Sequence, residues 1–223
     1  MCGVLGTEHE KVVKQLAGGD VVLDMFAGIG PFALPAARKG CIVLANDLNP
    51  ESYRWLNENI QKNRRARTQG VQTFNMDGRQ FIETAAKECM VKLMREEKSE
   101  NDNKRIHVLM NLPASAIEFT DVFVGLLSDV DKNSLSRIVV PRVHCYCFSK
   151  ANDKVADVKD RVEKAMKQPL PDDANVRLVR NVAPMKDMMC IEFSLTESVL
   201  FGSEHITTSR SCSEPLEKKQ KCE

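Results

Sequence analysis

Three observations predict an α/β fold in which a mostly parallel sheet carries helices on both faces. Short apolar runs alternate with stretches of helical periodicity along most of the chain, as they do where crossover helices join parallel strands. The first apolar run leads directly into a glycine turn, Gly28-Ile29-Gly30. The last two β-rich runs, at 176–182 and 188–195, are separated by too few residues for a crossover helix, so we expect these strands to be antiparallel.

The elements are expected in a regular order. A helix from Glu8 to Leu16 comes first, and Gly18-Gly19 ends it. Strands and helices then alternate, with strands at 21–24, 41–46, 71–75, 106–110 and 138–148 and helices at about 31–39, 51–63, 79–93, 117–126 and 153–167. We expect one folded domain over residues 1–198, followed by a polar, disordered tail over residues 199–223.

Composition limits the classes of function. The 223 residues are 43% hydrophobic and 28% charged, which is ordinary for one globular domain. The sequence shows no apolar run of membrane-spanning length and no secretory leader, so we expect an intracellular protein. A net charge of +1 excludes a general basic field for nucleic acid. RNA affinity would have to be local, and Arg64, Arg65 and Arg67 are candidates for phosphate contact or for favouring the end of the preceding helix.

No metal site is expected. The eight cysteines are scattered along the chain, without a C-x-x-C pair and with only four histidines. Cys145 and Cys147 alternate with Tyr146 along an expected strand, so we interpret them as small buried hydrophobes on one face rather than as zinc ligands.

Acids close the first two expected strands. Asp24 stands directly before the glycine turn, and Asp47 follows the second apolar run. Gly28 and Gly30 let the backbone approach a ligand closely, and the helix that follows directs free N–H groups to the same place. A carboxylate at the position of Asp47 can accept both hydroxyls of a ribose. The pattern predicts a nucleotide cofactor.

The turn departs from the dinucleotide-binding fingerprint. Ala33 replaces the third glycine, and Pro31 stands at the start of the helix, so the turn need not hold a diphosphate. Asp24 would repel phosphates but suits an ammonium group, such as the amino group of a methionine moiety. We therefore expect S-adenosylmethionine rather than NAD.

Two further strand ends carry polar residues. Asp77-Gly78 would suit an adenine edge, although Asp77 could equally cap the next helix. Asn111, in Asn111-Leu112-Pro113, offers a donor and an acceptor that could read or polarise a base edge. Because ligands bind at the carboxyl ends of parallel strands, we expect these residues to share one crevice with Asp24 and Asp47.

These segments together resemble the eukaryotic and archaeal tRNA (guanine-37, N1)-methyltransferases. The matching motifs run from Asp24 to Phe32, from Asn46 to Pro50, from Asn75 to Phe81 and from Asn111 to Pro113, with further similarity at 144–148 and 182–184. The resemblance covers roughly residues 5–195. It implies a seven-stranded class I methyltransferase fold and methyl transfer from S-adenosylmethionine to N1 of the guanine beside the anticodon of tRNA.

The resemblance also implies roles for single residues. Guanine N1 is protonated at neutral pH, so a base must take its proton as the nitrogen attacks the methyl group. The family carries its base in a Thr-Glu segment before the first strand, which matches Thr7-Glu8 and makes Glu8 the expected general base, with Asn111 holding the guanine. The residues expected at the cofactor are His9, Asp24, Phe26, Gly28, Gly30, Asp47, Leu48, Asp77, Gly78 and Asn111.

Two departures from the family pattern qualify this interpretation. Val4 stands where the family has an arginine, and the sequence does not contain the upstream tRNA-binding region or its active-site arginine. We expect the catalytic half of a longer enzyme, acting as a monomer, and the resemblance allows for the cytoplasm, the nucleus or the mitochondrial matrix.

Three other functions stay open. The related tRNA enzyme that transfers the aminocarboxypropyl group of the same cofactor in wybutosine synthesis shares the first motifs, although Asn111-Leu112-Pro113 favours the methylating branch. A methyltransferase for exocyclic amines would carry Asn-Pro-Pro-aromatic, which Leu112 and Ala114 interrupt. The chain could also be a cofactor-binding module that has lost RNA capture and, with it, catalysis.

Overall fold

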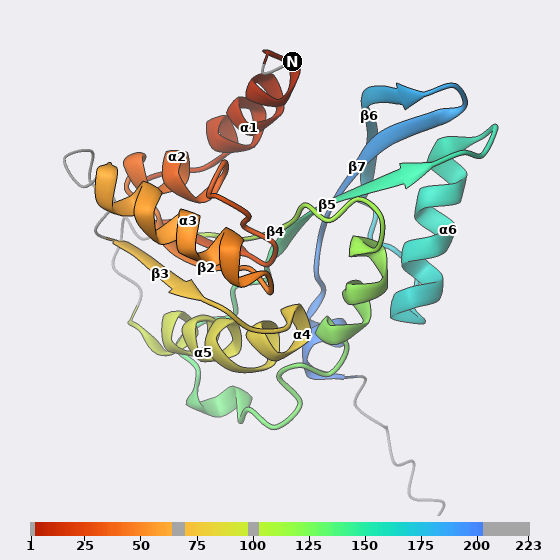
Figure 1. The fold of residues 1–223 in the computed structure, drawn as a ribbon. Coiled ribbons are helices and arrows are strands. Elements are labelled where there is room, and N and C mark those ends of the chain that lie inside the picture. Colours follow the sequence, from red (N-terminus) through yellow and green to blue (C-terminus); the bar gives the residue numbers. More distant parts are fainter. Residues whose placement is uncertain (1–2, 64–69, 98–102, 203–223) are drawn as a thin grey trace, which may run out of the picture.

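The computed structural model describes residues 3–63, 70–97 and 103–202, with side chains from Glu8 onward (Figure 1). These residues form a seven-stranded sheet in the order β3-β2-β1-β4-β5-β7-β6. β1 to β5 pair in parallel, whereas β7 is antiparallel to both β5 and β6. The predicted α/β fold, with its final antiparallel pair, is confirmed.

The strands are β1 (Val21–Asp24), β2 (Ile42–Asn46), β3 (Val71–Phe74), β4 (Ile106–Met110), β5 (Arg142–Ser149), β6 (Asn175–Ala183) and β7 (Lys186–Ser194). The α-helices are α1 (Gly3–Gln15), α2 (Ala33–Arg38), α3 (Pro50–Lys62), α4 (Gly78–Phe81), α5 (Lys87–Arg95), α6 (Lys154–Met166) and α7 (Glu197–Phe201). A π-helical turn, η3 (Ile82–Ala86), joins α4 to α5, and two 3₁₀ helices are η4 (Ala116–Phe123) and η5 (Lys132–Ser134).

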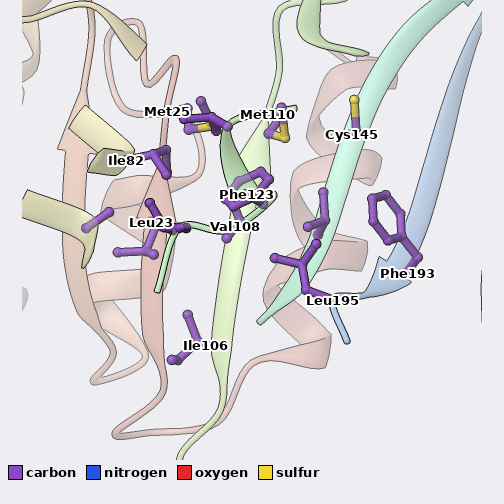
Figure 2. Close-up of a cluster of buried hydrophobic side chains, with 14 of the residues drawn as sticks. Leu23, Met25, Ile82, Ile106, Val108, Met110, Phe123, Cys145, Phe193 and Leu195 are labelled. Carbon is purple, nitrogen blue, oxygen red and sulfur yellow. The ribbon is translucent and has the colours of Figure 1, made fainter. Parts of the chain in front are cut away.

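Helices cover both faces of the sheet because successive strand residues point to opposite sides. Val22 of β1 belongs to the apolar cluster under α1, α2 and α3, whereas its neighbour Leu23 belongs to the cluster on the other face. That second cluster is covered by α5, η4, α6 and α7, and Figure 2 shows part of it, with Leu23 and Val108 of the sheet near Phe123 of η4.

The strand order fixes where a ligand can bind. From β1 the chain builds outward through β2 and β3, and it then returns to add β4 on the other side of β1. In open α/β sheets the crevice lies at the carboxyl ends of the strands where the order reverses. Here that place is between the ends of β1 and β4, next to Asp24 and Asn111.

Two helices that frame the sheet begin at side-chain caps. The Asn49 side chain accepts a hydrogen bond from the Glu51 amide (3.0 Å), with Pro50 at the first helical position of α3. The Asp153 side chain accepts one from the Ala156 amide (2.9 Å) at the start of α6. Both caps satisfy amides that the helix itself leaves free.

The structure differs from the expected elements in several places, and the first helix already begins at Gly3 rather than Glu8. β5 begins at Arg142 rather than near Ile138, because Pro141 has no N–H to donate to a neighbouring strand. The helix expected over 117–126 is the 3₁₀ helix η4 followed by turns. The domain boundary expected at residue 198 falls inside α7, where Val199 and Leu200 are buried, so the folded part reaches at least Phe201.

Candidate active site

The glycine turn after β1 is held by Asp47. The Gly28 amide donates to Asp47 Oδ2 (2.8 Å), and the Asn49 amide donates to Asp47 Oδ1 (2.9 Å). Gly28 and Gly30 have φ of 55° and 93°, values that L side chains rarely adopt. A Cβ on Gly30 would lie 2.8 Å from Leu56 Cδ1, whereas a Cβ on Gly28 would meet nothing within 4 Å. The open side of the turn is therefore at Gly28.

Asn46 ties the ends of three strands together. Its side-chain amide donates to the carbonyl groups of Met25 (3.2 Å) and Met76 (3.0 Å), and its side-chain oxygen accepts from the Met76 amide (3.1 Å). Asn46 is fully buried, so these bonds are shielded from water. Asn46 belongs to the motif that runs from Asn46 to Pro50, but nothing in the sequence indicates that it joins three strand ends.

Asp24 is buried without a hydrogen-bond partner. Its side chain is 0% exposed, and neither carboxylate oxygen has a hydrogen-bond partner of normal geometry among the described residues. Burial raises the pKa of Asp24 to about 7, the nearby Asp47 adds to the rise, and the Phe26 amide opposes it in part. A buried acid of this kind is costly unless a cation or a donor reaches it. Asp24 is thus suited to receive a positively charged ligand group.

Asp77 and Gly78 lie at the start of α4. Asp77 Oδ1 accepts from the Arg79 amide (2.8 Å), so the helix-capping role left open by the sequence is present in the structure. Gly78 is buried, and a Cβ there would lie 3.0 Å from Phe26 Cε1. Phe26 in turn packs edge-on against Phe119, with ring centroids 5.1 Å apart. A side chain at position 78 would therefore press against this aromatic pair, which would have to shift by a few tenths of an ångström.

Asn111 follows β4, where the sheet order reverses. Its side-chain oxygen is buried and has no hydrogen-bond partner among the described residues. The carbonyl of Pro113 accepts from the Phe148 amide (2.9 Å), which holds the Asn111-Leu112-Pro113 loop to β5. Leu48, expected at the cofactor, is 66% exposed. The ends of the strands thus carry, among the described residues, a buried amide oxygen without a partner at Asn111 and an exposed apolar side chain at Leu48.

Glu8 and His9, the two remaining expected site residues, lie on α1. The His9 ring packs edge-on against Phe32, just after the glycine turn, with centroids 4.3 Å apart. Glu8 is buried (3% exposed) and paired through both oxygens: Lys11 Nζ donates to Oε1 (2.8 Å) and an Arg177 guanidinium nitrogen donates to Oε2 (2.6 Å). Burial alone would raise the pKa of Glu8, but these two cations outweigh it and lower the pKa.

Arg177 belongs to a buried ionic cluster that the sequence did not reveal. A second guanidinium nitrogen of Arg177 donates to Glu192 Oε1 (3.3 Å). His144 Nδ1 lies 3.4 Å from the same carboxylate oxygen, and His144 Nε2 lies 3.0 Å from His107 Nδ1. Burial and the neighbouring His144 lower the pKa of His107 to about 4. Burial would raise the pKa of Glu192, but the contacts with His144 and Arg177 outweigh it and lower the pKa to about 2. Glu192 is therefore ionised at neutral pH.

Long-range pairing explains why this cluster escaped the sequence analysis. Glu8 and Arg177 are 169 positions apart, and Glu192 faces His144 only through the antiparallel register of β5 and β7. No local motif marks any of these contacts.

Several expected features remain outside these observations. Arg64, Arg65 and Arg67 lie outside the described residues. In the part of the chain that the structure describes, no cluster of three or more His, Cys, Asp or Glu residues could hold a metal ion, and no helix is long and apolar enough to cross a membrane.

The acceptor groups at these strand ends fit S-adenosylmethionine. Asp24 offers a buried carboxylate that has no hydrogen-bond partner among the described residues, and a Cβ on Gly28 would meet nothing within 4 Å. Asp47 keeps lone pairs free beyond its two backbone bonds, because a carboxylate has about four acceptor sites. The sheet order and this crevice define the class of the protein, which has the fold of class I methyltransferases.

Comparisons with known proteins identify the family. The family model described as the TRM5/TYW2 methyltransferase domain matches residues 3–168, and the chain belongs to this family. The tRNA (guanine(37)-N(1))-methyltransferase of Danio rerio is 50% identical over 219 residues, which cover 98% of this chain and 43% of that protein. The enzyme of the same name from Homo sapiens is 42% identical over 219 residues, covering 98% and 42%.

A solved structure agrees with the family assignment. The crystal structure of Trm5b from Pyrococcus abyssi superposes with a TM-score of 0.61 at 28% identity, over 87% of this chain and 49% of that one. The chain therefore spans less than half the length of these relatives.

Proposed function

We propose that this chain is the catalytic part of a tRNA methyltransferase that moves a methyl group from S-adenosylmethionine to N1 of guanine 37. The observation that carries the proposal is the 50% identity, over nearly the whole chain, to a relative of that name. The crevice supports it, because the open glycine turn and the unpartnered Asp24 suit this cofactor. Both relatives compared above carry the methyltransferase name, which favours methylation over aminocarboxypropyl transfer.

Each site residue has a distinct task in this proposal. When bound, S-adenosylmethionine supplies an electrophilic methyl group on a sulfonium. Asp24 would bind the amino group of the cofactor, and Asp47, which holds the Gly28 amide, would accept from the ribose hydroxyls. Asn111, whose side-chain oxygen lacks a partner, accepts from the guanine edge.

Glu8 takes the proton from guanine N1 in this mechanism. Removal of that proton would free an electron pair on N1 for the methyl group that S-adenosylmethionine would supply. Its lowered pKa keeps Glu8 ionised at neutral pH, so the carboxylate is ready to accept. Water-excluded surroundings strengthen the interaction between the carboxylate and the N1–H group.

The proposed substrate requires RNA capture from outside this crevice. The net charge of +1 gives the chain little general attraction for RNA. We propose that the upstream region implied by the family resemblance supplies most of the tRNA affinity, with Arg64, Arg65 and Arg67 adding local contacts. The chain alone should bind tRNA weakly and with strong salt dependence.

Single-turnover methylation tests the proposal. A tRNA transcript with guanine at position 37 is incubated with S-adenosylmethionine labelled in the methyl group, and the modified atom is mapped; a transcript with adenine at position 37 is the control. We expect label at N1 of guanine 37, slowly with this chain and much faster when the upstream region of the Danio rerio relative precedes it. Label on an exocyclic amine, or transfer of the aminocarboxypropyl group, would exclude the proposed reaction.

Equal rates with and without the upstream region would show that this chain recognises tRNA unaided. In that case the division of labour proposed above would be wrong, while the chemistry would stand.

A further inference from the structure

The two cations that bind Glu8 differ in how firmly they are held. Lys11 lies three positions along the same helix, and its side chain is 56% exposed. Arg177 comes from β6, its side chain is only 22% exposed, and it also donates to Glu192. Figure 1 shows how far apart these elements are in sequence, with α1 at the start of the colour bar and β6 near its end. The carboxylate is therefore held rigidly at one oxygen and loosely at the other.

Arg177 is itself fixed from several sides. It pairs across the sheet with Cys190, whose neighbour Tyr146 lies opposite on β5, so these three side chains share the face under α1. Glu192 anchors the guanidinium, and Arg142 and His144 approach Glu192 at 3.8 and 3.4 Å. A planar guanidinium that bridges two carboxylates has little freedom to turn.

Few charged groups lie near Glu8 among the residues whose side chains the structure describes. Lys11 stands on its own helix, Arg177 on β6 and Glu192 on β7. Tyr146 on β5 and Cys190 on β7 are also near, but burial raises the pKa of both groups well above neutral, so both stay uncharged. Burial lowers the pKa of His9, which favours the neutral imidazole. Arg177 and Lys11 are thus the two positive charges that act on Glu8 from these elements.

We propose that Arg177 is a positioning residue for Glu8: it holds Oε2, aims Oε1 at the substrate, and leaves Lys11 to be displaced when guanine arrives. The inference rests on the proposed function, in which Glu8 is the base. The Lys11 side chain is 56% exposed, so its ammonium group can move into water when the substrate N1–H takes its place at Oε1. The buried bond from Arg177 remains, and it keeps the carboxylate in place during proton transfer.

A matched pair of variants separates positioning from simple charge. Arg177→Met and Lys11→Met each remove one positive charge from Glu8, but only the first frees Oε2 from its anchor. The protein assayed is this chain joined behind the upstream region of the Danio rerio relative, at saturating tRNA and cofactor. We expect Arg177→Met to slow single-turnover methylation about 10²-fold, the scale of a misplaced catalytic group. Lys11→Met should change the rate by less than about threefold.

The pH dependence supplies a readout that a merely structural role would not move. Loss of an opposite charge at this range raises the pKa of a carboxyl by about 1–3 units. In Arg177→Met, the acid limb of the rate profile and the Glu8 carboxyl titration followed by carbon-13 NMR should both move up by at least about one unit. Arg177→Lys should move both by less and should recover part of the rate. It also serves as the folded variant if Arg177→Met melts below the assay temperature.

The outcomes separate the two proposals. Equal rate losses in Lys11→Met and Arg177→Met, or a Glu8 titration unchanged by Arg177→Met and Arg177→Lys, would overturn the role of Arg177. An undiminished rate in Glu8→Gln would instead remove Glu8 as the base, which is a failure of the proposed function. The Glu8 titration would then still report whether Arg177 holds the carboxylate.

Discussion

The two polar regions of this molecule are built in opposite ways. At the carboxyl ends of β1 and β4, Asp24 and the side-chain oxygen of Asn111 are buried and have no hydrogen-bond partner in the part of the chain that the structure describes. On the inner face of β5 to β7, the buried acids Glu8 and Glu192 are both paired with Arg177. A buried polar group without a partner costs free energy that an incoming ligand can recover. The first region is therefore ready for a ligand, whereas the second is a support that is already complete.

The largest expected effect concerns the residue that links the two regions. Glu8→Gln removes the proton acceptor but keeps the shape of the side chain, so the single-turnover methylation rate should fall by about 10²–10⁴. Cofactor affinity, measured by calorimetry, should stay nearly unchanged because Glu8 lies in the completed support. A matching loss of cofactor affinity would show that the two regions are not separable in the way described.

Asp24 provides the next largest effect, on stability rather than rate. Its pKa is raised to about 7, so the folded chain binds a proton that the unfolded chain, with a pKa near 3.8, releases earlier. Stability from this group is therefore present below pH 4 and is lost as the pH rises from about 4 to 7. Asp24→Asn should be more stable than the parent at pH 8 by on the order of 2–4 kcal/mol, with little difference at pH 4.

Urea denaturation at the two pH values checks the Asp24 prediction. The same variant should lose cofactor binding, so the stability gained and the affinity lost come from one carboxylate. Equal stabilities of parent and variant at pH 8 would mean that Asp24 already has a partner in the free protein.

Much of the ligand-ready region could be predicted from the sequence because its signals are local. Glycines at a turn, acids at strand ends and Asn111 before a proline all lie within a few residues of the strand they close. The crevice at the reversal of strand order then follows from general rules of parallel sheets. The fold was predictable for the same reason, since alternating periodicities mark each strand and helix.

The completed support could not be predicted in this way. Arg177 lies in β6, whose residues are all half-buried or exposed. The pattern of residue types in this strand therefore does not show whether Arg177 forms a buried ion pair or is a solvated cation. Its partner Glu8 is 169 positions away, and the contact exists only once β6 has been placed at the sheet edge. Asp47 and Asp77 both accept hydrogen bonds from backbone amides. The sequence alone does not show whether these carboxylates hold the backbone, bind a ligand, or do both.

Asp47 combines the features of both regions: it is a proposed ligand of the cofactor, and it already accepts hydrogen bonds from backbone amides. Asp47→Ala should weaken S-adenosylmethionine binding by at least about tenfold, since it removes an acceptor and frees the Gly28 amide. Calorimetry measures the affinity, and Asp160→Ala on the outer face of α6 is the control, because Asp160 is 57% exposed and pairs only locally with Lys164. If the parent chain, shown to be folded, gave no heat with the cofactor or with its demethylated product, the assignment of this crevice would fail.

The glycine turn offers a last comparison, in which substitutions at Gly28 and Gly30 should affect stability and cofactor affinity in opposite order. Gly30→Ala places a Cβ 2.8 Å from Leu56 at a φ of 93°, so it should lower the free energy of unfolding by about 2–3 kcal/mol. Gly28→Ala meets no atom within 4 Å at a φ of 55°, so it should cost only about 1 kcal/mol.

The open space at Gly28 is where the cofactor is proposed to approach the backbone, and its loss should weaken cofactor binding. Gly28→Ala should therefore bind the cofactor less tightly than the less stable Gly30→Ala does at a temperature where both are folded. The reverse order of affinities would place the cofactor on the other side of the turn, away from Asp24.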